Sequence, residues 1–138
     1  MKNGLMTLLL TPVVLVLILF CGISAAEPMG TKSDGGFYAV DLQIVPSQPV
    51  VGKNTVILTI YDGRSNAKIE GAVIEVIPWM TIHGHGSPKN AIVKEQGGGK
   101  YAVENVYFTM EGDWDLLINI TKNGIKDTVI FTVKKVKN

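Results

Sequence analysis

Hydrophobic residues alternate with polar ones along most of this chain, and a period of two is the pattern of half-buried β-strands. The clearest run covers residues 114–121, in which a tryptophan, a leucine and two isoleucines occupy every second position. The stripe of period 3.6 that an amphipathic helix requires is missing from these runs. Seven runs separated by turn residues predict seven strands, at about residues 37–45, 54–61, 72–77, 91–95, 101–108, 114–121 and 126–134.

Seven short strands at this spacing are typical of an immunoglobulin-like β-sandwich. The dipeptide Asn123-Gly124 separates the last two strands and is a strong signal for a tight hairpin turn. The cysteine pair of antibody domains is absent, since Cys21 is the only cysteine of the chain. We therefore expect an all-β domain whose stability comes from its apolar core alone, which the length of the chain allows.

The first 26 residues have the composition of a secretory signal peptide. Lys2 precedes an apolar run over residues 5–20, and Ser24 and Ala26 put small residues just before a cleavage site. A retained membrane anchor through residues 5–20 is the alternative, because about 20 apolar residues span a bilayer. Either reading places the protein outside the cytoplasm, in the periplasm or at the cell surface. We expect a signal peptide or anchor at residues 1–26, a flexible linker at 27–36 and the sandwich at 37–138.

The charge balance narrows the range of partners. Cleavage after Ala26 removes Lys2 from the 13 Lys and Arg residues, which leaves 12 against 12 Asp and Glu. A neutral chain without a basic run argues against nucleic acid or an anionic membrane surface as the main partner. Cleavage also removes Cys21, so the exported domain would contain neither a thiol nor a disulfide.

The residues best suited to chemistry gather in one short loop. His83 and His85 are the only histidines of the chain, with Gly84 between them and Met80 shortly before them. Met110 lies in a later turn that also separates two expected strands. Imidazole and thioether ligands together suit copper, and Cu(I) in particular. Zinc is less suited, because its protein ligands are cysteine, histidine and carboxylates.

Topology predicts that these two loops meet. In a sandwich of this type the chain crosses from end to end with each strand, so every second loop lies at the same end. The histidine loop and the Met110 turn are separated by one other loop, and we expect them at the same end. The candidate copper ligands are therefore Met80, His83, His85 and Met110, and the candidate wall or docking residues are Trp79 and Trp114.

Simpler interpretations stand beside this one. The histidine pair could hydrogen-bond the backbone of its own Gly-rich turn. Met110 could fill the core at a strand end, and the parity of Trp114 with Leu116 favours a core position for that tryptophan. No nucleophile with a base and an oxyanion hole is recognisable, so we do not expect an enzyme. Two functions stay open: a copper-binding protein, and a non-catalytic interaction module of a membrane complex that holds no metal.

The chain resembles the YtkA-like domain family, which is related to FixH. The resemblance covers about residues 50–121 and is carried by residues 78–80, 83–86, 97–101 and 108–114. It implies a small extracytoplasmic β-sandwich connected with copper handling, with assembly of haem-copper oxidases or with metal efflux. From this resemblance together with the ligand set, we expect delivery or sequestration of Cu(I), with a membrane-bound oxidase-assembly or metal-efflux protein as partner. FixH proteins keep a membrane anchor, which is consistent with a tether through residues 5–20.

Overall fold

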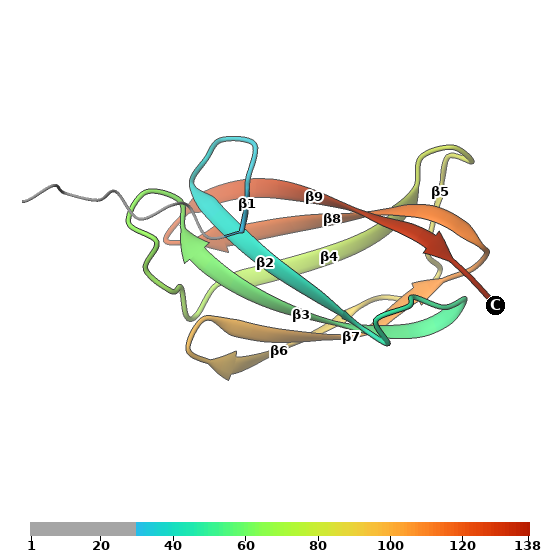
Figure 1. Ribbon diagram of the computed structural model, residues 1–138. Coiled ribbons are helices and arrows are strands. Elements are labelled where there is room, and N and C mark those ends of the chain that lie inside the picture. The colour runs from blue at the N-terminus through green and yellow to red at the C-terminus, as the bar shows by residue number, and fades with distance from the viewer. Residues whose placement is uncertain (1–29) are drawn as a thin grey trace, which may run out of the picture.

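The computed structural model describes residues 30–138, and within them it contains strands and turns but no helix. The all-β prediction is confirmed. The strands, labelled in Figure 1, are β1 (Thr31–Lys32), β2 (Tyr38–Val45), β3 (Gly52–Asp62), β4 (Val73–Met80), β5 (His85–Gly86), β6 (Ile92–Gly97), β7 (Lys100–Phe108), β8 (Gly112–Lys122) and β9 (Ile125–Val136).

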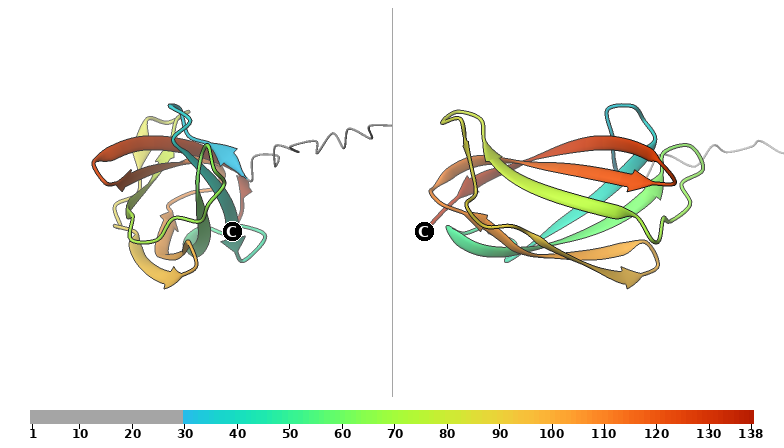
Figure 2. Two further views of the ribbon diagram at one scale, coloured as in Figure 1. Left: turned by 90° about the vertical axis from the view of Figure 1, so that its left-hand side faces the viewer. Right: turned by 180° about the vertical axis from the view of Figure 1, so that it is seen from behind.

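Two antiparallel sheets pack face to face. One has the order β1-β2-β3-β7-β6 and the other the order β5-β4-β8-β9 (Figures 1 and 2). Leaving out the two shortest strands, this is the division into four and three strands that defines an immunoglobulin constant-type sandwich. The alternation predicted for β8 is confirmed, because Trp114, Leu116, Ile118 and Ile120 are all fully buried between the sheets.

The seven predicted strands correspond to β2, β3, β4, β6, β7, β8 and β9. β4 continues three residues beyond the predicted end at Ile77, through Pro78 to Met80. Proline is tolerated there because β4 is an edge strand over most of its length, so a missing N–H leaves no neighbouring strand without a partner. β1 and β5 were not predicted, since two residues are too few to show a period.

Residues 1–29 are outside the described part of the chain. The predicted signal peptide or anchor at residues 1–26 and the possible tether through residues 5–20 therefore stay predictions. Within residues 30–138, no helix is long and apolar enough to cross a membrane.

The end of the predicted linker packs against the domain. Thr31 and Lys32 pair with β2, and Ser33 is buried. The Ser33 hydroxyl donates a hydrogen bond to Asp127 of β9 at 2.5 Å, and the backbone N–H groups of Gly35 and Phe37 donate to the same carboxylate at 3.0 and 3.3 Å. Composition predicts flexibility for this segment, whereas residues 31–37 are held by pairing with β2 and by hydrogen bonds to Tyr38, Thr128 and Asp127, the last about 90 residues away in the sequence.

Replacing Asp127 by asparagine should lower the free energy of unfolding by about 1–3 kcal/mol, because several buried donors lose their charged acceptor. Burial alone would raise the pKa of Asp127, but the hydrogen bonds from Ser33, Gly35, Thr128 and Phe37 outweigh it and lower that pKa. A lowered pKa means that this stabilisation is complete above the unfolded-state pKa of about 3.9 and is lost as the pH falls through the folded-state pKa.

The measurement is urea unfolding of the wild type and the Asp127→Asn variant between about pH 7 and pH 3. The free energies of unfolding of the two proteins should differ by a constant amount above about pH 5. They should approach each other in more acidic buffer. Asp34→Asn, at an exposed site of the same segment, is the control and should behave as the wild type. If the difference in the free energy of unfolding is as large at about pH 3 as at pH 7, the charge of the carboxylate has no part in this stabilisation.

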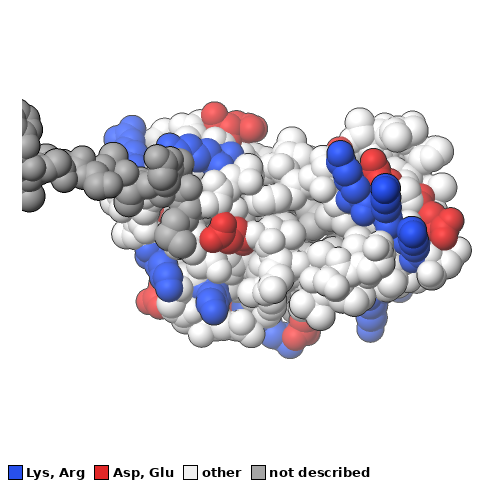
Figure 3. All heavy atoms as spheres, viewed as in Figure 1, with Lys and Arg blue, Asp and Glu red and all other residues white. Residues whose placement is uncertain are grey.

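Charged side chains are spread over the surface with both signs together. On the face in Figure 3, Lys and Arg side chains gather toward the two ends, with Asp and Glu beside them, and the middle is largely uncharged. Lys94 and Glu104 form an exposed salt bridge at 2.8 Å. This face therefore offers no continuous basic surface to a polyanion.

Candidate metal centre

The histidine loop and the Met110 turn lie at the same end of the sandwich (Figure 1). The pairing of β4 with β8 brings them there, since Trp79 at the end of β4 is opposite Asp115 near the start of β8. The chain end after β9 lies at this end too. The arrangement predicted from the order of the strands is thus present in the fold.

Backbone hydrogen bonds form the turn that carries the histidines. The carbonyl oxygen of Met80 accepts the N–H groups of His83 at 3.1 Å and Gly84 at 2.9 Å. Gly84 has a φ of +66°, a left-handed conformation that glycine adopts without strain. The chain then returns as β5, which pairs His85 with Met80 and Gly86 with Trp79.

The two imidazole rings lie stacked beside each other. Their centroids are 6.0 Å apart and their planes differ by 26°. An ion bound at about 2.0–2.1 Å to one nitrogen of a ring lies about 3 Å from that ring's centroid. The distance between the two rings is therefore compatible with one shared ion, but each nitrogen binds in the plane of its own ring, so the stacked rings must turn about their side-chain bonds to share it.

Neither ring is used to hold the turn together. Among the described residues, the one hydrogen-bond contact found for either imidazole is from Nδ1 of His85 to the carbonyl oxygen of Gly86, at 3.4 Å, which is long for a hydrogen bond. His83 is exposed and His85 is half-buried. The backbone hydrogen bonds already form the turn, and the structural role of the histidine pair stays an alternative prediction that only the His85 contact represents.

Trp114 forms the floor beneath His85. Its indole is fully buried, and its ring meets the imidazole of His85 edge to face with centroids 5.6 Å apart. On its other side it packs against Phe108 at 5.3 Å. The indole N–H donates a hydrogen bond of 3.0 Å to the carbonyl oxygen of Met110, which fixes the β7–β8 turn beside the histidines. Trp114 is therefore a core residue and a boundary of the candidate site at once.

The two methionines of the predicted ligand set differ sharply in exposure. Met80 is 2% exposed and belongs to the hydrophobic core, where its methyl group packs against Gly112 so closely that a Cβ there would lie 3.0 Å away. As the partner of His85 across the strand pair, Met80 shares a face with it. Met110 is 39% exposed. Solvent therefore reaches the thioether of Met110 and hardly that of Met80.

Trp79 lies on the opposite face of β4 from Met80, as alternation requires, and is 38% exposed. Its ring covers Gly86, where a Cβ would lie 3.2 Å from the indole. The structure thus places Trp79 on the outside of the β4–β5 pair rather than beside the imidazoles. Of its two predicted roles, docking suits this position better than forming a wall of the site.

Carboxylates do not complete the site. Within residues 30–138, no group of three or more histidine, cysteine, aspartate or glutamate side chains could hold a metal ion. The nearby acidic residues already accept hydrogen bonds: Asp115 from the hydroxyl of Thr81 at 2.6 Å, Asp113 from the N–H of Lys135 at 2.9 Å and Glu111 from the N–H of Asn138 at 3.0 Å. An ion bound at this end would depend on the imidazoles and on thioether sulfur.

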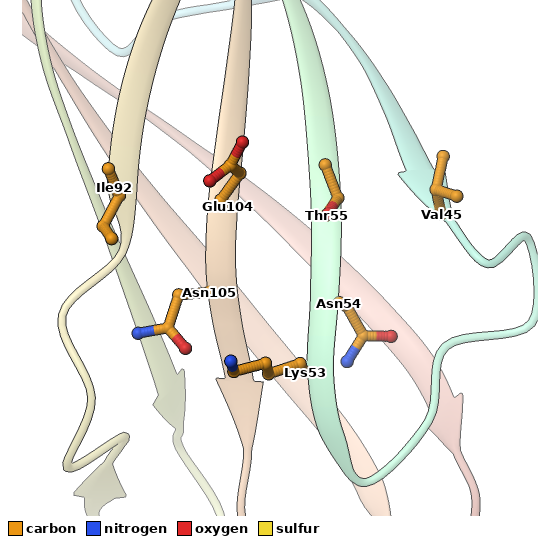
Figure 4. Close-up of a pocket in the computed structure, with 7 residues that line it drawn as sticks. All are labelled: Val45, Lys53, Asn54, Thr55, Ile92, Glu104 and Asn105. Atoms are coloured by element: carbon orange, nitrogen blue, oxygen red, sulfur yellow. The ribbon is translucent and has the colours of Figure 1, made fainter.

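A hollow of about 450 Å³ lies on the outer surface of the five-stranded sheet and is drawn in Figure 4. Three of its polar side chains already form contacts within the sheet. Glu104 is paired with Lys94, Asn105 donates to the carbonyl oxygen of Asn90 at 2.8 Å, and Asn54 bonds the backbone of Val50. The lining contains neither histidine nor methionine, so the hollow is a weaker candidate than the histidine end.

The fold and the histidine pair define a small immunoglobulin-like sandwich with a candidate ligand site at one end. Residues 33–119 match the family model described as YtkA-like. The match covers more than half of the chain, and the protein therefore belongs to the YtkA-like family. The further relation to FixH stays a prediction. No curated protein sequence is significantly similar to this chain.

Solved structures of several bacterial proteins share the fold. They include a DUF4426 family protein from Pseudomonas aeruginosa, with a TM-score of 0.52, 13% identity and coverage of 75% of this chain and 94% of that one. A copper-bound variant of FetP from uropathogenic Escherichia coli has a TM-score of 0.53 and 11% identity, with coverage of 79% and 96%. A copper-bound variant of P19 from Campylobacter jejuni has a TM-score of 0.54 and 10% identity, with the same coverage. At these identities the likeness concerns the fold alone.

Proposed function

We propose that this protein binds copper, most readily as Cu(I), at the histidine end of the sandwich and outside the cytoplasm. The observation that carries the proposal is the pair of imidazoles 6.0 Å apart, neither of which the turn needs for its own hydrogen bonds. The fold shared with copper-bound FetP and P19 is in keeping with it. The protein has a binding role, without catalysis.

The ligand chemistry favours the reduced ion. Imidazole nitrogen is a borderline ligand and thioether sulfur a soft one, a combination that suits Cu(I). His83, His85 and the exposed Met110 supply this set at the surface, while Met80 lies beneath His85 in the core. Because the ion would have few ligands and the site is partly exposed, an incoming partner protein can replace the ligands one at a time. The protein would therefore deliver or sequester copper, with a membrane-bound oxidase-assembly or metal-efflux protein as the recipient or donor.

The direct test is an anaerobic Cu(I) titration of the full chain against a competing chelator, with elemental analysis of the loaded protein. The wild type should bind one equivalent, and a variant with both His83→Ala and His85→Ala should bind more than about tenfold more weakly. Fluorescence of Trp114 should fall as copper binds, because His85 lies against its ring. Lys89→Ala, at an exposed position of the same loop, is the matched control.

Equal affinity of the wild type and the double variant would refute the site. Loss of affinity in Lys89→Ala as well would indicate that the whole loop had been disturbed, and it would remove the case for the two imidazoles in particular.

A second candidate is an interaction module that holds no metal. Its supporting observation is the exposed apolar side chains around the loop, with Ile82 81% exposed at the tip and Trp79 38% exposed on β4. This function predicts that a partner is retained by the protein equally well with copper or with a copper chelator, and is lost from the Trp79→Ala variant. Copper-dependent retention would favour the first function instead.

A further inference from the structure

β4 has a free edge next to a groove. It pairs with β8 along Val73–Trp79 on one side, whereas on the other side β5 reaches only Trp79 and Met80. Within the described residues no strand pairs with the segment from Val73 to Ile77 on that second side. The right-hand view of Figure 2 shows β4 running along the open side of the sandwich, with β6 at the edge of the other sheet. A groove of about 340 Å³ lies between them, lined by residues 74–77, Asn90, Ala91 and Val93.

One backbone hydrogen bond shows which groups of β4 face this groove. The N–H of Ser87 donates to the carbonyl oxygen of Pro78 at 3.2 Å, so the backbone of residue 78 points to the free side of β4. Along a strand these directions alternate, and the pairing of β4 with β8 is regular. The N–H and C=O groups of Ile74 and Val76 therefore point into the groove. A free edge of two donors and two acceptors is the complement of another extended backbone.

Both ends of the groove are closed by contacts. At one end the N–H of Gly71, just before β4, donates to the carboxylate of Glu95 in β6 at 2.7 Å. At the other end β5 occupies the edge and Ser87 takes the carbonyl group of Pro78. The opening between them therefore accepts a short extended segment in line with β5, rather than a helix.

The side chains define what such a segment should contain. Ile74 and Val76 point inward, so the residues opposite them would enter the apolar space near Ala91 and Val93. Glu75 points outward, where Asn119 donates to its carboxylate at 2.9 Å, and it is the only charged residue in the lining. Directly opposite residues share a face, and opposite charges there attract. The matching sequence alternates apolar residues with a lysine or arginine opposite Glu75.

We propose that this edge binds an extended segment of a partner protein, apolar at alternate positions and basic opposite Glu75, which adds a strand to the four-stranded sheet. A second copy of the chain suits the edge poorly. Antiparallel pairing of two β4 strands that uses Ile74 and Val76 of both copies puts the two Glu75 carboxylates opposite each other, and like charges there repel. This inference goes beyond copper binding and does not depend on it.

The test uses the full chain, without metal, and synthetic peptides of about seven residues. One peptide alternates lysine with valine, the second alternates glutamate with valine, and the third is a scrambled form of the first. The lysine peptide should bind, and it should slow hydrogen exchange of the Ile74 and Val76 amides roughly tenfold. The glutamate and scrambled peptides should bind roughly tenfold more weakly.

Charge reversal then locates the contact. Glu75→Lys should make the glutamate peptide the stronger ligand, while Asp34→Lys, at an exposed position elsewhere, should keep the order of the wild type. Binding should persist in the double histidine variant, which separates this proposal from the copper site. Unprotected Ile74 and Val76 amides at peptide saturation, or an unchanged preference in Glu75→Lys, would overturn it. Protection of the same amides in a dimer without peptide would assign the edge to a second copy and overturn it as well.

Discussion

Replacing Trp114 by alanine should lower the free energy of unfolding by about 3–5 kcal/mol, the largest effect that we expect from a single truncation of the core. The indole is fully buried, packs against Phe108 and donates its N–H to the carbonyl oxygen of Met110. Its removal leaves a cavity and removes the hydrogen bond that supports the β7–β8 turn. It also removes the ring against which the imidazole of His85 packs. Chemical denaturation monitored by circular dichroism measures the loss.

The second tryptophan of the chain is the matched control. Trp79 is 38% exposed on the outer face of β4, so Trp79→Ala should cost much less, about 1 kcal/mol. Similar losses for the two variants would contradict the assignment of Trp114 to the core and Trp79 to the surface. Trp114→Phe keeps most of the packing but cannot donate to Met110, and a stability between those of the wild type and Trp114→Ala would separate the hydrogen bond from the cavity.

Truncation of the two methionines of the candidate site should change different properties, stability for Met80 and Cu(I) affinity for Met110. Met80→Ala should lower the free energy of unfolding by about 2–5 kcal/mol, because its side chain fills the core against Gly112. Met110→Ala should change stability by less than about 0.5 kcal/mol, since its side chain is exposed. If the proposed copper site is correct, Met110→Ala should also weaken Cu(I) binding by roughly tenfold.

Leucine variants keep the side-chain volume and remove only the sulfur. Met80→Leu should stay within about 1.5 kcal/mol of the wild type and keep its Cu(I) affinity, whereas Met110→Leu should lose affinity as the alanine variant does. The anaerobic chelator competition distinguishes them. Weaker binding by Met80→Leu together with unchanged binding by Met110→Leu would make the buried sulfur the ligand, and our assignment of the exposed one would be wrong.

Much of the fold was predictable because its signals are local. Alternation within a strand reports which side chains face the core, and Trp114 to Ile120 of β8 follow it without exception. The position of Met80 was also recoverable, since it continues the inward series of Ile74 and Val76. The predicted strand stops at Ile77 because Pro78 follows it, and proline usually interrupts a sheet. A proline ends a central strand but can lie in one whose second edge is free.

The two short strands, β1 and β5, could not be predicted from the local sequence pattern. β1 and β5 are each two residues long, and they exist because a neighbouring strand offers backbone partners to them. Ser33 and Gly35 are ordered by Asp127, at the opposite end of the described chain. Composition assigned this segment to a linker, because a contact over such a distance leaves no trace in the residues nearby.

The sequence by itself determined the all-β class, the strand order that brings the histidine loop and the Met110 turn to one end, and the presence of imidazole and thioether together. These follow from periodicity, connectivity and residue type, which are properties of the linear chain. Only the tertiary structure decided that backbone hydrogen bonds form the histidine turn, that Met80 is buried while Met110 is exposed, and that one edge of β4 lies open beside a groove. Burial and hydrogen-bond pairing depend on which surfaces the two sheets bring together, and that is settled only when they pack.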